Sequence, residues 1–321
     1  MERINCAENK KKRLLPVIIV AMIASLILCL CGCGEVQPPS SVQGDSSVQD
    51  DSDVTVDDVV ADDETSETEA TEAEVTIEET QLYNANGIVV TATKIENSMW
   101  GTEISVAVSN ESAKNICVTT NDLSVNGYML SSSGLYAEAA AGKKAYESIT
   151  LMSSELDEAG IETVAEVEFC LNIYDSETFD DIDNTDLIKL STSAAENFNQ
   201  PIDDSGDIIY DANGVRVICK GLRDDVIWDG CVVFYFENNN DGYVSIYSEN
   251  VSVNDVMVDE SLWVDLRANT RSVDAMYLWT LEDVGVTSIS DVENIEFNLR
   301  IVDEDWDDIA VSDVISLNFN E

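Results

Sequence analysis

YNANGIVVTATKI (residues 83–95) and YDANGVRVICKGL (residues 210–222) are two versions of one stretch, and together they decide the fold. In each version an Asn-Gly pair is followed by a segment in which apolar residues recur at alternate positions. Asn-Gly is a turn signal, and apolar–polar alternation is typical of a β-strand with one buried face. Each version therefore predicts a turn that leads into a strand.

The similarity between the two halves continues along the chain at an offset that stays between 125 and 128 residues. WGTEISVAVSN from Trp100 matches WDGCVVFYFEN from Trp228, and EVEFCLNIYD from Glu166 matches NIEFNLRIVD from Asn294. An offset of this length is too long for a solenoid repeat, so it indicates the duplication of a whole domain.

Alternation with a period of two runs through both copies, and clusters such as SNESAKN and ENNNDG separate the alternating segments. Roughly seven strands in about 110 residues per copy favour an antiparallel sandwich of the immunoglobulin-like type. The predicted fold class is all-β, with two tandem immunoglobulin-like β-sandwich domains. We expect the first domain at residues 82–192, a linker at 193–207 and the second domain at 208–321.

The N-terminus has the pattern of an export signal. A basic cluster at residues 10–13 precedes an apolar run at residues 14–30. A helix that spans a membrane needs about 20 apolar residues, so this run is short for one. An uncleaved anchor helix and an ordinary secretory signal are the alternative interpretations.

The apolar run ends in Leu-Cys-Gly-Cys, which resembles the lipobox of bacterial lipoproteins. Cys33 follows a small residue, whereas Cys29 and Cys31 each follow a leucine. The resemblance implies that residues 1–32 are a lipoprotein signal peptide, that Cys33 carries a diacylglycerol, and that cleavage makes Cys33 the first residue. Two acyl chains suffice for stable membrane anchoring, where one is marginal.

Residues 33–81 form a strongly acidic segment. Residues 34–80 hold sixteen Asp and Glu residues, with no Lys, no Arg and no aromatic residue. Such a composition cannot bury enough apolar surface to offset the entropy of ordering. We expect a disordered tether that lifts the folded domains off the membrane, with an acidic docking segment as the alternative.

The lipobox, the acidic segment and the tandem units together resemble Gram-positive bacterial cell-surface lipoproteins with tandem immunoglobulin-like domains. The resemblance covers nearly the whole chain, and the motifs that carry it are structural. It implies a fold and a location at the extracellular face of the cell membrane. It carries over no catalytic residue.

The charge of the chain excludes several partners. With 16 Lys and Arg against 64 Asp and Glu, the formal net charge is −48. Nucleic-acid binding depends on basic side chains at phosphates, so we expect no nucleic-acid partner. Strong net charge also favours solubility and a monomeric state.

Catalytic and metal-binding motifs are missing from the sequence. The chain has no histidine, which removes Ser-His-Asp triads, Cys-His pairs and imidazole metal sites. A twelve-residue calcium loop with Gly242 at its sixth position would need a bidentate Glu at its last position, where Ser248 stands. We therefore predict no enzyme activity, no cofactor and no dedicated metal site, and weak calcium binding at the acidic surface is left open.

The two copies share no cysteine position, so no common disulfide framework supports the fold. Strand parity places Cys117, Cys170 and Cys231 on outward faces and Cys219 on an inward face. We expect the four side chains to be reduced thiols, although a bridge between Cys117 and Cys170 is conceivable.

One difference between the copies indicates a ligand surface. Outward positions of the second copy carry aromatic residues where the first copy has small or aliphatic ones; they are Tyr235, Tyr243, Tyr247, Tyr277 and Trp279. Exposed Tyr and Trp often anchor interfaces. An immunoglobulin-like order puts the strands with Tyr235, Tyr277 and Trp279 side by side, so these three are the ligand-surface candidates. The competing interpretation is that the rings pack against the first domain or one another.

These expectations define a function class. The chain is predicted to be a membrane-anchored extracytoplasmic lipoprotein, held by lipid on Cys33, that acts as a non-catalytic binding or structural module. Its partner would be a cell-envelope protein or glycan. An accessory subunit of a transporter or wall-modifying complex is the alternative, and a carboxylate-dependent hydrolase is a third interpretation.

Replacing Cys33 with Ala should release the protein from membranes, because the acyl chains would have no thiol to modify. Fractionation of cells that produce Cys33→Ala and the natural chain measures this. An unmodified Cys33 in a membrane-bound protein, or a mature N-terminus at another residue, would contradict the lipobox interpretation.

Overall fold

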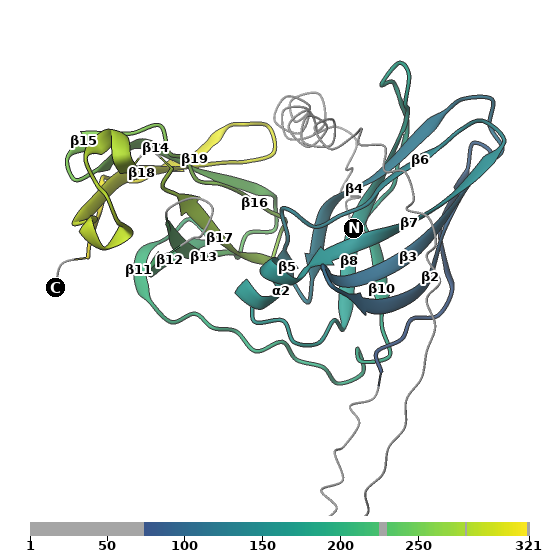
Figure 1. Ribbon diagram of the computed structural model, residues 1–321, viewed down its shortest axis with the longest axis horizontal. Helices are drawn as coiled ribbons and strands as arrows, with labels where there is room; N and C mark the ends of the chain where they lie inside the picture. Colours follow the sequence, from purple (N-terminus) through teal and green to yellow (C-terminus); the bar gives the residue numbers. More distant parts are fainter. Residues whose placement is uncertain (1–73, 225–229, 280, 320–321) are drawn as a thin grey trace, which may run out of the picture. The chain divides into compact units, whose positions relative to one another are not determined.

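The computed structural model describes residues 74–224, 230–279 and 281–319 (Figure 1). The predicted signal peptide, Cys33 and nearly all of the predicted tether lie outside the described residues. No helix within the described ranges is long and apolar enough to cross a membrane. The described chain is almost entirely β-structure with antiparallel sheets, which confirms the predicted all-β class.

The two stretches that open the sequence form matching β-hairpins. Strand β1 (Thr80–Ala85) and strand β2 (Ile88–Ser98) flank Asn86 and Gly87, whose φ values are 56° and 75°. Strand β11 (Asp207–Ala212) and strand β12 (Val215–Arg223) flank Asn213 and Gly214, with φ values of 53° and 73°. Two consecutive residues with positive φ make the tight turn that suits the twist of a hairpin, and Asn-Gly is the pair that adopts it most readily.

Ten strands make up the first repeat. Its first sheet has the order β1-β2-β3-β7. In its second sheet β4 pairs with β5, β6 and β8, and β8 also pairs with β9 and β10. The remaining bounds are β3 (Gly101–Asn110), β4 (Ile116–Val125), β5 (Tyr128–Met129), β6 (Tyr136–Ala139), β7 (Lys143–Met152), β8 (Glu166–Asp175), β9 (Asp181–Asn184) and β10 (Ile188–Ser191).

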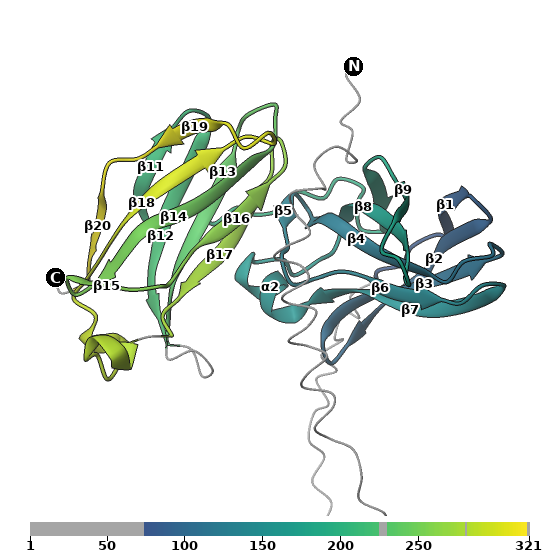
Figure 2. The same cartoon turned by 90° about the horizontal axis from the view of Figure 1, so that it is seen from above.

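The second repeat has a counterpart for every strand of the first, and Figure 2 shows its two sheets as two layers. Strands β11, β12, β13 and β17 follow the order of β1, β2, β3 and β7, and β14 pairs with β15, β16 and β18. Strand β18 also pairs with β19 and β20. The bounds are β13 (Cys231–Asn238), β14 (Val244–Val253), β15 (Val256–Met257), β16 (Trp263–Leu266), β17 (Arg271–Tyr277), β18 (Asn294–Val302), β19 (Asp308–Val311) and β20 (Ile315–Asn318).

Within residues 74–224, 230–279 and 281–319, helical structure is confined to short turns. The first repeat has the helix α2 (Ser153–Glu158), and the second repeat has the 3-10 helix η2 (Leu281–Val284) at the equivalent place. A second 3-10 helix, η3, covers Ile289–Asp291. These turns lead from the seventh to the eighth strand of each repeat.

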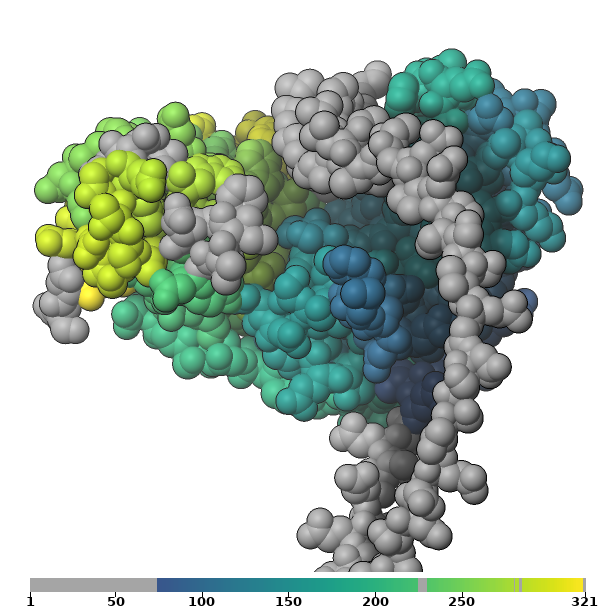
Figure 3. Space-filling view, in the orientation of Figure 1, coloured from purple at the N-terminus to yellow at the C-terminus, as the bar shows by residue number. Residues whose placement is uncertain are grey.

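Each repeat supplies most residues of one hydrophobic core, although Ile218 and Tyr235 of the second repeat belong to the first core and Met129 of the first repeat belongs to the second. Phe169 and Ile104 belong to the first core, and Phe234 and Phe297 meet edge to face in the second with ring centroids 6.0 Å apart. The two repeats appear as a blue-to-teal part and a green-to-yellow part of the surface (Figure 3). Two cores, each built mainly from one repeat, are what a duplication of a folding unit produces.

The folded part begins earlier than the sequence predicts. Val75 and Ile77 pack against the first core, and the Ser193 backbone N–H donates to the carbonyl of Thr76 over 2.7 Å. The last residues assigned to the tether therefore belong to the first repeat, because alternate aliphatic side chains give them surface to bury.

A buried asparagine ties the two sheets together in both repeats. Asn110, at the end of β3, donates through Nδ2 to the carbonyls of Lys114 and Ala139 at 2.8 Å each. Asn238, at the end of β13, donates to the carbonyls of Gly242, Leu266 and Arg267 at 2.9, 3.2 and 2.9 Å. Both side chains are fully buried. Ala139 and Leu266 end strands of the opposite sheet, so each amide fixes the crossing between the layers.

Replacing Asn238 with Ala should destabilise the second repeat by about 3 kcal/mol, because several buried carbonyls lose their donor. Chemical denaturation of the purified protein measures this. Asn84→Ala, at an exposed asparagine, serves as the control and should change the free energy of unfolding by less than about 0.5 kcal/mol. Equal effects of the two substitutions would show that the buried amide is dispensable.

Candidate functional site

The three predicted ligand-surface residues do not form one exposed surface. Tyr235 is 1% exposed and belongs to the core cluster of the first repeat, together with Tyr128. Burial raises the pKa of the Tyr235 hydroxyl to about 12. The expectation that Tyr235 is exposed is therefore wrong, and the packing interpretation applies to this ring.

The reason lies in what covers the outer face of β13. Strand β17 pairs with β13 on one side and, through Arg271 and Tyr128, with β5 of the first repeat in parallel. The Arg271 guanidinium carbon also lies 5.4 Å from the centre of the Tyr128 ring. Residues of the first repeat therefore pack at this edge of the sheet, where strand parity alone predicts solvent.

Tyr277 and Trp279 differ in exposure. Cys231 of β13 is paired with Tyr277 of β17, so the two strands are neighbours in one sheet, as expected. Tyr277 is half-buried, whereas Trp279, just beyond the end of β17, is 52% exposed. Only Trp279 of the three candidates is well exposed.

A different set of aromatic residues meets on the outer face of the second sheet of the second repeat. The Tyr247 and Trp263 rings are stacked at 5.2 Å with planes 11° apart, and the Trp306 ring lies 5.4 Å from that of Trp263. Trp263 is 48% exposed, and the other two are half-buried. We call Tyr247, Trp263 and Trp306 the Trp263 cluster.

The strand register builds most of this cluster. Tyr247 on β14 is directly opposite Trp263 on β16, and on its other side it is opposite Arg300 on β18. The neighbours Ile246 and Val264 point inward and are buried. Alternation along β14 and β16 therefore places both rings on the outer face.

Trp306 reaches the cluster from the loop between β18 and β19. Its φ is 67°, a left-handed backbone conformation that is rare for a bulky residue. Asp303 holds the loop in this shape: its carbonyl accepts from the N–H of Trp306 at 3.1 Å. One of its carboxylate oxygens accepts from the N–H groups of Asp305 and Asp307 at 2.9 and 3.0 Å. Strained backbone of this kind often supports a functional position.

The surroundings of the cluster are acidic. Arg300 donates through Nε and Nη2 to the carboxylate of Asp308 at 2.7 and 2.8 Å, and through Nη1 to Glu249 at 3.2 Å. These carboxylates raise the pKa of Arg300, while burial raises the pKa of the Tyr247 hydroxyl. Arg300, next to the cluster, is bonded to Asp308 and Glu249. The site therefore combines aromatic rings with hydrogen-bond acceptors and negative charge.

The first repeat has aromatic residues at two of the three equivalent positions. Tyr136 corresponds to Trp263 and is 61% exposed. Phe179 corresponds to Trp306, is 71% exposed, and has a φ of 60°. Phe179 stacks on Tyr174 with a centroid distance of 6.2 Å. Thr119 stands where the second repeat has Tyr247, so the complete stack is specific to the second repeat.

The described cysteines form no disulfide, in line with the expected reduced thiols. All four are buried, including those assigned to outward faces. Cys117 lies against Tyr174 and Tyr136, and burial raises the pKa of its thiol. Cys219 belongs to the second core, so its inward prediction is confirmed. Within the described ranges there is no group of three or more Cys, Asp or Glu residues that could hold a metal ion.

Comparison with known proteins places the chain in no family: no protein-family model and no curated protein matches it. It is similar to red sea bream transglutaminase at 8% identity, over 74% of this chain and 32% of that one, with a TM-score of 0.20. The exo-chitosanase CsxA of Amycolatopsis orientalis matches at 15% identity over 70% and 26% of the two chains, with a TM-score of 0.19. The chain thus spans about a third or less of either protein's length.

A third similar structure is the CsuC–CsuE chaperone–tip adhesion subunit complex of Acinetobacter baumannii. The identity is 12% over 67% of this chain and 90% of that one, with a TM-score of 0.20. TM-scores this low carry no argument about fold or function, so the site rests on its own geometry.

Comparing two substitutions at Trp306 should isolate the backbone strain. Trp306→Gly and Trp306→Ala both remove the ring, but only glycine relieves the left-handed conformation. We expect the glycine variant to be more stable by about 1 kcal/mol in chemical denaturation. Equal stability, or a more stable alanine variant, would contradict the left-handed backbone at this position.

Proposed function

We propose that the chain is a membrane-anchored extracytoplasmic lipoprotein that acts as a non-catalytic binding module of the cell envelope. The observation that carries the binding role is the Trp263 cluster, a partly exposed stack of Tyr247 and Trp263 to which a strained loop adds Trp306. The lipobox-like sequence around Cys33 supports the anchor and the location.

An immunoglobulin-like fold is part of this proposal. Without β1, the strands β2, β3 and β7 correspond to strands A, B and E of such a sandwich. Strands β6, β4 and β8, followed by β9 and β10, correspond to C′, C, F and G. Sandwiches of this type commonly bind ligands through their sheet faces and end loops. The Trp263 cluster lies where a sheet face meets the F–G loop.

A glycan of the envelope is the ligand class that fits the cluster best. The C–H face of a sugar ring can pack on exposed Tyr and Trp rings, which provide large contact area at low entropy cost. Carboxylates such as Asp308 and Glu249 can accept hydrogen bonds from sugar hydroxyl groups. The acidic surroundings disfavour an anionic polymer and favour a neutral or amino-sugar chain.

The double substitution Tyr247→Ala and Trp263→Ala should weaken binding to isolated cell-envelope glycan at least tenfold, because both stacking surfaces disappear. Sedimentation of the purified protein with envelope fragments measures this. Tyr136→Ala, at the equivalent exposed position of the first repeat, is the matched control and should leave binding unchanged.

Two outcomes would redirect the proposal. Loss of binding in Trp279→Ala, with the double variant unaffected, would move the ligand surface to the end of β17. Binding to a membrane protein rather than glycan, detected by cross-linking in intact cells, would favour the alternative of an accessory subunit of a transporter or wall-modifying complex.

A further inference from the structure

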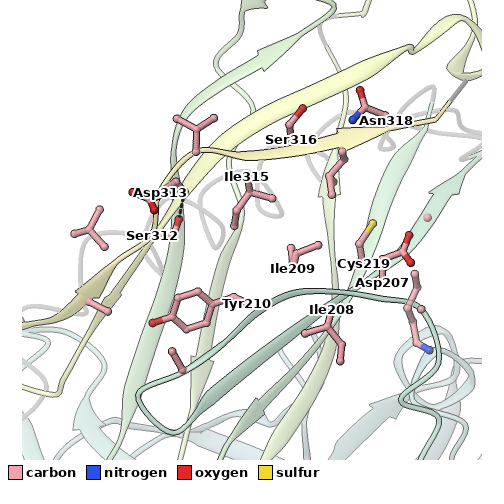
Figure 4. Close-up of a pocket in the computed structure, with 18 of the residues that line it drawn as sticks. Asp207, Ile208, Ile209, Tyr210, Cys219, Ser312, Asp313, Ile315, Ser316 and Asn318 are labelled. Atoms are coloured by element: carbon pink, nitrogen blue, oxygen red, sulfur yellow. Dashed lines mark hydrogen bonds between the residues drawn. The ribbon is translucent and has the colours of Figure 1, made fainter.

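A groove opens at one edge of the second repeat, between β11 of one sheet and β20 of the other (Figure 4), and no residue of the Trp263 cluster lines it. Its volume is about 1050 Å³. Side chains of Ile209 on β11, Cys219 on β12 and Ile315 on β20 point into it. Ile208 and Val314 add apolar surface at the rim, where they are 54% and 63% exposed.

Both walls of the groove are sheet edges. Among the described residues β11 pairs only with β12, and β20 pairs only with β18. Edge strands present backbone N–H and C=O groups that another strand can pair with. The groove therefore offers hydrogen-bonding backbone as well as apolar surface.

In the first repeat the chain itself closes the equivalent edge. The Tyr83 hydroxyl on β1 donates to Asp183 Oδ2 on β9 at 2.7 Å, which links the two sheets. Val75 and Ile77 pack against the core, and Thr76 between them exchanges hydrogen bonds with Ser193, just beyond β10. An extended Val-Thr-Ile segment therefore covers apolar surface beside the last strand.

The second repeat lacks both of these closing features. Ala310 stands where the first repeat has Asp183, so the Tyr210 hydroxyl has no carboxylate to bond across the groove. Ile202, the counterpart of Val75, is 49% exposed. Its neighbours Asp203 and Asp204 bond to Lys220 and Arg216 instead, at 2.9 and 3.3 Å.

We propose that this groove binds an extended peptide strand of a partner protein, with aliphatic side chains at alternate positions. The strand pairs with the free edge of β20, and its alternate side chains fill the space beside Ile209 and Ile315, much as Val75 and Ile77 pack against the core of the first repeat. This is strand addition, in which backbone bonds give affinity and side-chain pockets give specificity.

The negative charge of the chain favours a partner strand whose flanking residues are basic. The net charge is −48, and at the groove Lys220 is already bonded to Asp203, while Asp207 and Asp313 add two carboxylates. A strand flanked by Lys or Arg is attracted to this field, and an acidic one is repelled, more strongly at low salt.

Three labelled hexapeptides test the proposal by fluorescence anisotropy with the purified full chain. Lys-Val-Thr-Ile-Lys-Lys has the alternation of the Val75–Ile77 segment with basic flanks. Glu-Val-Thr-Ile-Glu-Glu has the natural flanks of that segment. Lys-Thr-Val-Ile-Lys-Lys keeps the charge and composition of the first peptide but places its aliphatic residues side by side.

We expect the first peptide to bind at least tenfold tighter than the third at every salt concentration. Its advantage over the second should be large at low salt and should shrink in 1 M NaCl. Equal binding of the first and third peptides would overturn the proposal, because attraction would then be electrostatic only. Absence of binding by all three would overturn it as well.

Substitutions locate the site. Ala310→Asp should restore the bond to Tyr210, narrow the groove and weaken binding of the first peptide at least fivefold, with unchanged or higher thermal stability. Val314→Lys, at the rim, should also weaken it, whereas Val256→Lys, the same change at an exposed position of β15, adds the same charge elsewhere and should not. Equal effects of the two lysine variants, or full binding by a folded Ala310→Asp variant, would exclude the groove.

Discussion

The buried amide at the end of the third strand is the constraint on which both repeats depend. Asn110 and Asn238 lie where the chain leaves one sheet for the other, and each satisfies backbone carbonyls from both sides of that crossing. A buried carbonyl without a donor is costly, so few side chains can replace asparagine there. With the crossing fixed, the fourth strand has one direction and one register, and the second sheet assembles on it.

The strands could be predicted well from the sequence because the features that form them lie within each short segment. Asn-Gly pairs set the hairpins, and alternation set which residues of β3 and β18 point inward. The same parity rule failed for Tyr235, because parity distinguishes two faces of a sheet but not what covers them. Residues such as Tyr128, more than a hundred positions away, bury that ring. The Trp263 cluster was missed for a related reason: its three rings come from two strands and a loop, and only the register of β14 and β16 brings them together.

The two repeats differ at positions outside the core, where a change can alter binding without altering the fold. Their inward residues match in kind, so the fold constrains them alike. Tyr247 replaces Thr119 and completes an aromatic stack, while Ala310 replaces Asp183 and leaves an edge open. Each change adds a feature to the second repeat without altering its strand order. The first repeat retains the closed form of the same architecture, which makes it an internal reference for the second.

The one-to-one correspondence of strands also bears on how the chain reaches its native state. During folding, β3 must find β7 rather than β17, although β17 occupies the equivalent place in the second repeat and pairs antiparallel with β13 in the same way. Tandem domains of similar sequence are prone to exchange equivalent strands and become trapped. The divergence between the copies opposes this: a Tyr235-bearing strand does not match the surface that accepts Ala107, and a Thr119-bearing strand leaves Trp263 without its stack. Low similarity between neighbouring repeats thus acts as a safeguard against misassembly.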